Sequence, residues 1–127
     1  MSFSTFGLSD EIIRAVTERG YTVPTPIQTQ AIPAVLAGGD LLAGAQTGTG
    51  KTAAFTLPIL QRMMQFESAS TSPARHPVRA LMLAPTRELA DQIALSVQRY
   101  AKHTSLRTAV IFGGMDMRPQ TEALRSG

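Results

Sequence analysis

Ala45-Gln46-Thr47-Gly48-Thr49-Gly50-Lys51-Thr52 is the most informative run of this chain, because it has the residues and spacing of a phosphate-binding loop. Its glycines let the backbone curl so that N–H groups converge on a polyphosphate. Lys51 supplies a cation for the β- and γ-phosphates, and the Thr52 hydroxyl can hold Mg²⁺. The usual pattern begins with Gly, whereas this run begins with Ala45. The run predicts that the chain binds a nucleoside triphosphate.

The residues on either side of the run support the same interpretation. An apolar, strand-like segment (40–43) precedes it and a helix-forming segment (53–65) follows, so the N-terminus of a helix would point at the phosphates. The alternative is a turn rich in Gly and Thr that contains a lysine by chance. The order of strand, loop and helix favours the phosphate loop.

Segments farther from the loop alternate between helical and extended patterns. Helices are predicted over 9–19, with Ser9 as the cap, and from Thr25-Pro26 to 38, where Pro33 is expected to kink or divide the helix. Later segments predict apolar strands over 78–84 and 108–112 and helices over about 86–102 and 119–125. This alternation predicts an α/β fold in which a parallel, doubly wound sheet is flanked by helices.

Composition limits the class of protein. The chain has 127 residues, of which 43% are hydrophobic and 17% charged, as is typical of one globular domain. The absence of Cys excludes disulfides and thiolate zinc sites. No apolar run reaches the length of a membrane span, and the N-terminus lacks a basic, signal-like start. We therefore expect a cytoplasmic protein with no membrane partner.

The net charge of +3 is unevenly distributed. Residues 1–71 carry four basic and five acidic side chains, whereas residues 72–127 carry eight basic and four acidic ones. The second part is the better candidate for contact with an anionic polymer such as nucleic acid. An excess of this size is also common on solvated surfaces, so it favours nucleic acid only together with motifs.

Gln28 has two possible roles. Its amide can pair with the N6/N7 edge of adenine, and the nearby Tyr21 offers a flat face on which the base could stack. Alternatively, Thr25 and Gln28 have the spacing of a capping box, in which the Gln28 side chain reaches back to the Thr25 N–H. Spacing alone favours the capping box and leaves the adenine role open.

The run Pro85-Thr86-Arg87-Glu88-Leu89-Ala90 lies where a predicted strand gives way to a helix, which is the ligand-bearing edge of open α/β sheets. Exposed N–H groups and Thr86 could take a phosphate there, with Arg87 adding charge. Equally, Thr86 could simply cap the helix. Gly113-Gly114 could admit a sugar-phosphate backbone closely, or could be only a turn.

Together these motifs resemble the DEAD-box family of ATP-dependent RNA helicases. Residues 20–28 resemble the Q motif, 45–52 motif I, 85–90 motif Ia and Gly113-Gly114 the GG doublet, while Phe3 resembles the family's isolated upstream aromatic residue. The family's motif I begins with Ala, which accounts for Ala45. The runs 31–33, 53–58 and 112–114, with Pro119-Gln120, are similar to the bacterial RhlE-type subgroup. The resemblance also favours adenine contact for Gln28.

The resemblance implies that residues 1–127 form the N-terminal part of the first RecA-like lobe, a P-loop NTPase fold. It implies ATP and Mg²⁺ as cofactors, with Lys51 and Thr52 acting in catalysis and Thr52 as the metal ligand. The residues implied to contact ATP or ADP are Phe3, Tyr21, Val23, Gln28, Gln46, Thr47, Gly48, Thr49, Gly50, Lys51, Thr52 and Ala53. The residues implied to contact RNA, through its phosphate backbone and independently of its sequence, are Pro85, Thr86, Arg87, Gly113 and Gly114.

The chain lacks other motifs of that family, namely Asp-Glu-Ala-Asp, Ser-Ala-Thr and Thr-Pro-Gly-Arg. We therefore expect part of a lobe, truncated before the DEAD motif and catalytically inactive alone. In lobes of this kind, strands carrying the missing motifs lie between those before motif I and motif Ia. We expect a second chain, such as a swapped copy or the rest of the parent, to complete the sheet, or the strands to pair in another order. The alternatives are a non-catalytic nucleotide- or RNA-binding module and a P-loop NTPase with no RNA role.

Overall fold

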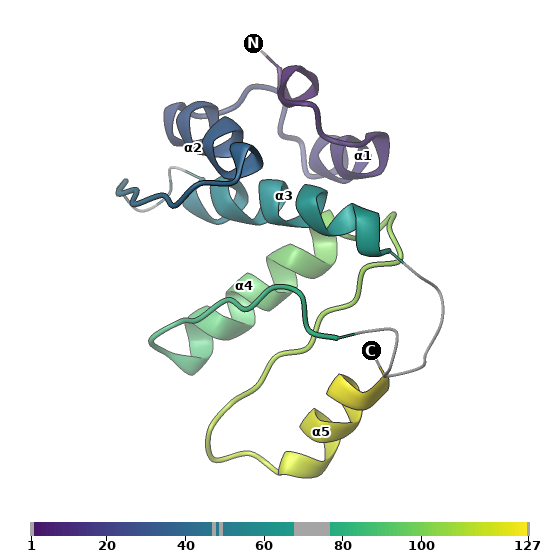
Figure 1. The fold of residues 1–127 in the computed structure, drawn as a ribbon. Helices are drawn as coiled ribbons and strands as arrows, with labels where there is room; N and C mark the ends of the chain where they lie inside the picture. Colours follow the sequence, from purple (N-terminus) through teal and green to yellow (C-terminus); the bar gives the residue numbers. More distant parts are fainter. Residues whose placement is uncertain (1, 47, 49, 68–76, 127) are drawn as a thin grey trace.

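The computed structural model describes residues 2–46, 48, 50–67 and 77–126. Helices account for all the regular structure in these ranges (Figure 1). In chain order they are the 3-10 helix η1 (Phe3–Phe6), α1 (Asp10–Glu18), α2 (Pro26–Ala37), α3 (Lys51–Met63), the 3-10 helix η2 (Met64–Phe66), α4 (Arg87–Tyr100) and α5 (Met117–Ser126). Each helix predicted from the sequence is present, with ends shifted by a few residues.

Local sequence explains where the first helices start and stop. Ser9 occupies the cap position of α1, but its side chain makes no capping hydrogen bond, and its backbone N–H instead donates to Gln61 Oε1 at 2.6 Å.

The predicted division of α2 at Pro33 is wrong, because α2 continues through this residue. A proline removes one backbone donor, and the burial of Ile32 against the core holds that turn of α2 in place. α2 ends at Gly38, whose φ of 95° lies in the left-handed region that favours glycine.

The core lies between the helices. Ile12 of α1, Ile32 of α2 and Leu57 of α3 have no exposed surface, and Val97 and Tyr100 of α4 pack into the same cluster. Because α3 contacts α1, α2 and α4, it is the central element of the packing (Figure 1). The phosphate loop directly precedes α3, so the best-packed helix of the molecule fixes the position of the loop's last residues.

The predicted parallel sheet is not found among the described residues. The segments 40–43, 78–84 and 108–112 run as irregular chain with no strand assigned, although Figure 1 shows 77–84 and 105–112 drawn out along α4. We call 77–84 and 105–112 the extended segments. A strand exists only where a neighbouring backbone completes its ladder of hydrogen bonds. The described residues supply no such neighbour, and they show no pairing of the strands in another order.

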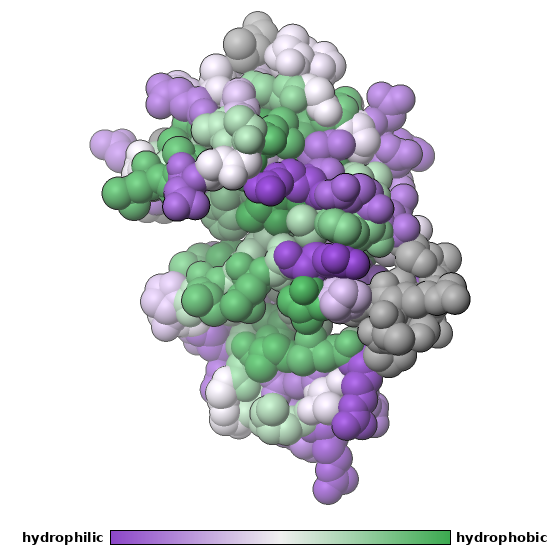
Figure 2. Space-filling model, viewed as in Figure 1, coloured by the Kyte–Doolittle hydropathy of each residue, from purple (hydrophilic) through white to green (hydrophobic). Residues whose placement is uncertain are grey.

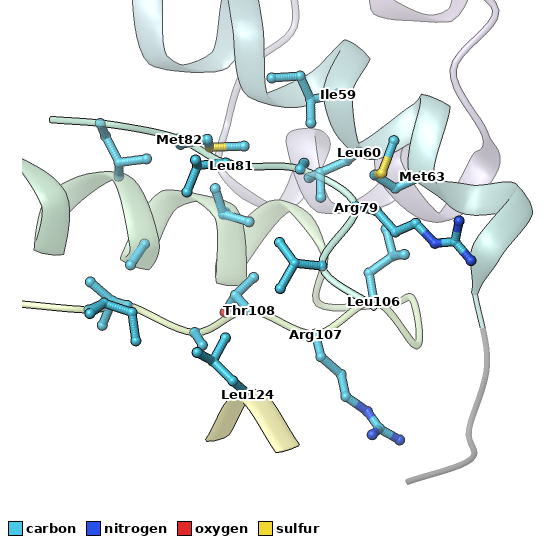
Figure 3. A pocket seen from close by; sticks show the side chains of 18 of the residues that line it. Ile59, Leu60, Met63, Arg79, Leu81, Met82, Leu106, Arg107, Thr108 and Leu124 are labelled. Carbon is cyan, nitrogen blue, oxygen red and sulfur yellow. The ribbon is translucent and has the colours of Figure 1, made fainter. Parts of the chain in front are cut away.

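An apolar groove lies between the extended segments. Its volume is about 500 Å³, and its lining includes Leu60 and Met63 from α3, Met82 and Leu106 from the extended segments, and Leu124 from α5 (Figure 3). On the face of the molecule that Figure 2 shows, apolar side chains gather around a hollow in the lower half. The groove occupies the space between the segments that were predicted to be strands.

Candidate functional site

The phosphate loop ends at the N-terminus of α3. Gly48 and Gly50 both have a φ of 83°, a left-handed conformation that side chains disfavour, and α3 begins at Lys51. Thr47 and Thr49 lie outside the described residues. Lys51 is exposed, and the first N–H groups of α3 have no carbonyl partner within the helix, so this end of α3 favours an anion.

Gln28 connects the Q motif to this loop. Its side chain is buried, with 3% exposed. Gln28 Oε1 accepts a hydrogen bond from the Thr25 N–H at 2.9 Å, and its Nε2 donates to the Gly50 carbonyl at 3.2 Å. The Gln28 N–H in turn donates to Thr25 Oγ1, so the capping box predicted from spacing is confirmed.

The capping box does not exclude adenine contact by Gln28. A primary amide carries two donor hydrogens, and its oxygen carries two acceptor lone pairs. The bonds to Thr25 and Gly50 use one donor and one acceptor, so each polar atom of the amide retains capacity for a second bond. The sequence posed the two roles as alternatives, whereas the bonding capacity of the amide is compatible with both, and the adenine contact stays a prediction.

Gly50 is restricted by this contact as well as by its φ. A Cβ atom at position 50 would lie 2.3 Å from Gln28 Nε2 and 3.4 Å from Thr25 Oγ1. The first distance is far below van der Waals contact. The loop therefore needs glycine here for the close approach of a side chain from another helix.

Tyr21 and Val23 are accessible in the Q motif. The Tyr21 ring is 39% exposed, and the Arg19 guanidinium lies over it, 5.8 Å from its centroid. Burial raises the pKa of Tyr100 to about 12, with a further contribution from the neighbouring Tyr21 hydroxyl. Val23 is 71% exposed. Tyr21 of the Q motif is thus a neighbour of Tyr100 at the end of α4.

Other residues implied to contact nucleotide differ in exposure. Phe3 is 4% exposed, and its ring packs against Phe6 with 6.1 Å between centroids, so it belongs to the core. Ala53, in the first turn of α3, is also buried. Thr52 is half-buried, and its carbonyl accepts a hydrogen bond from the Thr56 hydroxyl. The nucleotide contacts of these residues stay predictions.

Motif Ia and the GG doublet are brought together by Arg87. The Arg87 Nη2 donates to the Gly113 carbonyl at 2.9 Å, and the guanidinium lies 5.9 Å from the centroid of the Phe112 ring. Thr86 caps α4, because its hydroxyl accepts from the Leu89 N–H at 3.1 Å. The capping alternative is therefore confirmed for Thr86. Two motifs 26 residues apart form one exposed surface with Pro85.

One residue beside this surface was named in the subgroup resemblance but was given no role by the reasoning from sequence. Gln120 of α5 is 9% exposed, and its side chain bonds to the backbone on both sides of the Gly113-Gly114 turn. Nothing in its spacing separates it from a solvated helix residue. Only the geometry identifies it.

No cluster of three or more His, Cys, Asp or Glu side chains that could hold a metal ion occurs within the described ranges. In the same ranges, no helix combines the length and apolar character needed to cross a bilayer.

Comparison with known proteins places these motifs in a family. The family model described as DEAD/DEAH box helicase matches residues 25–127. The chain is 44% identical over 124 residues to the DEAD-box ATP-dependent RNA helicase RhpA of Helicobacter pylori, covering 98% of this chain and 23% of the relative. It is 46% identical over 123 residues to the ATP-dependent rRNA helicase rrp3 of Emericella nidulans, covering 97% of this chain and 25% of the relative.

Solved structures agree. A DEAD box protein from Methanococcus jannaschii matches with a TM-score of 0.85 at 35% identity, over 99% of this chain and 32% of that one. Prp28 from Chaetomium thermophilum, solved with ADP bound, matches with a TM-score of 0.84 at 39% identity, over 99% of this chain and 30% of that one. The chain spans about a quarter of the length of these two curated relatives. Because the family model matches most of its residues, this chain belongs to the DEAD/DEAH box helicase family.

Proposed function

We propose that this chain is the ATP-binding portion of an RNA helicase that couples ATP binding and hydrolysis to RNA binding and local duplex separation. The observation that carries the proposal is the hydrogen bond from Gln28 Nε2 to the Gly50 carbonyl. It holds an amide suited to reading adenine against a loop suited to holding phosphates. The names of the relatives support ATP use and RNA as the substrate class. The shared runs 53–58 and 112–114 favour the RhlE-type subgroup.

The base site is tested by nucleotide affinity in the full-length parent protein. Gln28→Ala should weaken ATP binding about tenfold or more, because a bidentate contact to the base is lost. Thr25→Ala is the matched control, since it removes one bond of the capping box and leaves the Gln28 amide in place. Calorimetry with ATP and GTP measures both variants. Equal ATP and GTP affinities in the unmodified protein would count against an adenine site.

For hydrolysis, this chain supplies a cation and one metal ligand. Lys51 would bind the β- and γ-phosphates, and the Thr52 hydroxyl together with the phosphates would hold Mg²⁺. Because the described residues offer no acidic cluster, the remaining ligands would come from the phosphates, water and residues outside this chain. When bound, Mg²⁺ would neutralise charge that develops on the phosphates. We expect the isolated 127-residue chain to show no RNA-stimulated hydrolysis.

RNA would be held at the surface formed by motif Ia and the GG doublet. Thr86, Arg87 and Gly113-Gly114 are exposed and close together, and the Arg87–Gly113 bond uses one of the five N–H donors of the guanidinium. Contacts of this kind bind phosphate and not base edges, so they position a strand without reading its sequence. RNA affinity should therefore fall with salt and vary little between RNA sequences.

The second candidate is a non-catalytic nucleotide- or RNA-binding module. The exposed phosphate loop alone is compatible with it, because such a loop can hold a nucleotide without hydrolysing it. The two candidates separate in an ATPase assay on the parent protein with and without RNA. Turnover that rises when RNA is added supports the helicase, and tight ATP binding with no turnover supports the module.

We further propose that chain from outside residues 1–127 completes the sheet. The apolar groove and the exposed apolar side chains of segment 77–84 support this, since Val78, Leu81 and Leu83 are 66–84% exposed. Exposed apolar segments of this kind promote association. The isolated chain should therefore form oligomers in light scattering, and co-expression with the rest of the parent should suppress them. A stable monomer with slow amide exchange in 78–84 would contradict this.

A further inference from the structure

Gln120 differs from its surroundings. Residues 113–119 are exposed, as are 122–125, whereas the Gln120 side chain is 9% exposed. A buried primary amide costs free energy unless its polar atoms have partners. Its environment therefore requires an explanation in terms of the contacts that it makes.

The amide bridges the two ends of the GG turn. Gln120 Oε1 accepts a hydrogen bond from the Phe112 N–H at 2.7 Å, and Nε2 donates to the Asp116 carbonyl at 3.0 Å. Phe112 ends an extended segment, and Asp116 directly precedes α5. The side chain thus supplies the acceptor that a neighbouring strand would otherwise give to Phe112, and it closes the chain around the two glycines.

A second element holds the same turn from the other side. Arg87, at the start of α4, donates to the Gly113 carbonyl. Gly113 directly follows Phe112, whose N–H donates to Gln120. A Cβ at Gly114, where φ is 76°, would lie 3.4 Å from Arg87 Nη2. Phe112 and Gly113, at the entry to the turn, are therefore held by side chains from α5 and α4 respectively.

We propose that Gln120 is a positioning residue that preforms the Gly113-Gly114 turn for the phosphate backbone of RNA. The inference rests on the proposed function of this surface. Glycine loses more backbone entropy on ordering than any other residue, so the ordering of a free Gly-Gly turn would weaken RNA binding. When the Gln120 amide already closes the turn, this entropy is lost during folding and no longer opposes RNA binding.

The chemistry of the two bonds makes glutamine specific at this position. Oε1 must accept and Nε2 must donate. A glutamate carboxylate can accept from Phe112, but it has no donor and would face the Asp116 carbonyl with a second acceptor. A protonated glutamate regains the donor. Methionine has a similar size but supplies neither bond.

The test measures RNA affinity of the full-length parent by fluorescence anisotropy from pH 5 to pH 8. Gln120→Met should weaken binding about tenfold at every pH, the size expected for the loss of one or two buried hydrogen bonds. Gln120→Glu should weaken it similarly at pH 8 and recover toward the unmodified protein as the pH falls, because the carboxyl takes up a proton. ATP affinity should not change in either variant.

Gln98→Glu is the control for added charge, since Gln98 is exposed on α4. It should show no recovery at low pH relative to the unmodified protein. If Gln120→Glu and Gln120→Met bind RNA as tightly as the unmodified protein while Arg87→Ala binds less tightly, this inference is wrong and the RNA surface stands. If Arg87→Ala also has no effect, the proposed RNA surface itself fails. Parallel loss of ATP affinity would assign Gln120 to global stability.

Discussion

The helical region (3–66) and the extended segments (77–84 and 105–112) satisfy their backbones differently. Helices α1, α2 and α3 close their hydrogen bonds internally and bury Ile12, Ile32 and Leu57 completely. The extended segments are equally apolar in sequence, yet Leu81 and Leu83 are 78% and 84% exposed. A helix completes its backbone locally, whereas a strand depends on another strand. The comparison shows that an apolar segment is buried only when the element against which it packs is present.

The same division separates the two proposed activities. The phosphate loop and Gln28 belong to the helical region, whereas Arg87 and the GG turn border the extended segments. If each region carries its own activity, substitutions in one should leave the binding step of the other intact. The following experiments test that separation.

The largest effect is expected for Lys51→Ala in the parent protein. Loss of the cation at the phosphates should lower ATPase turnover by roughly 10²-fold or more, in the range reported for removal of one stabilising group from a transition state. RNA affinity without nucleotide should be unchanged. Lys102→Ala is the matched control, since it removes the same charge at an exposed position away from the loop. Unchanged turnover in Lys51→Ala would exclude the phosphate loop from the mechanism.

A second experiment compares one leucine from each region by urea unfolding of this chain. Leu57→Ala should lower the free energy of unfolding by about 2–5 kcal/mol, because Leu57 is fully buried in α3. At concentrations where this chain is monomeric, Leu81→Ala should change it by about 0.5 kcal/mol or less, because most of Leu81 contacts solvent in the monomer. A large loss for Leu81→Ala would mean that the extended segments are covered in solution.

Arg87→Ala tests the RNA surface at a smaller scale. RNA affinity of the parent should fall about tenfold, and the slope of log affinity against log salt should decrease by about one, as for one lost phosphate contact. ATP affinity should stay as in the unmodified protein. An unaltered salt slope would reduce Arg87 to a structural link with Gly113.

The smallest effect concerns Glu18, which joins α1 to the end of α4. Hydrogen bonds from His103 and then Lys102 lower the pKa of Glu18 below its usual value. The stabilisation is therefore present above the pKa of the unfolded state, near 4.5, and is lost as the pH falls through the lower folded pKa. Glu18→Gln should slightly lower the melting temperature at pH 7 and have a smaller effect at pH 3. An equal difference at both values would exclude a charge effect.

The sequence predicted the helices and the motifs because both depend on local chemistry. Pro26 and Thr25 mark the start of α2, Gly38 marks its end, and the glycines of the loop are required by their positive φ. The sheet could not be predicted in the same way, because pairing depends on chain that the segments do not themselves supply. Pro33 does not divide α2, because burial of its neighbour Ile32 outweighs one missing backbone donor.

The site was predictable as a set of residues but not as a set of contacts. Spacing gave Thr25 and Gln28 as a capping box, and the chain order gave motif I, yet the bond between Gln28 and Gly50 joins residues 22 positions apart. Gln120 was missed for a different reason, since its partners Asp116 and Phe112 are near in sequence but lie across a glycine turn whose path cannot be read from spacing. A side chain that bonds to distant backbone leaves no periodic signal in the sequence.

The close approach of Gln28 to Gly50 has a consequence for protein engineering. A side chain at position 50 and the amide at position 28 would occupy the same space, so the two positions form one unit of substitution. A library that varies position 28 to change nucleobase preference would also move the carbonyl at the foot of the phosphate loop. Altered base choice and altered phosphate binding would then be inherited together, and a redesigned enzyme would need both positions varied in the same round.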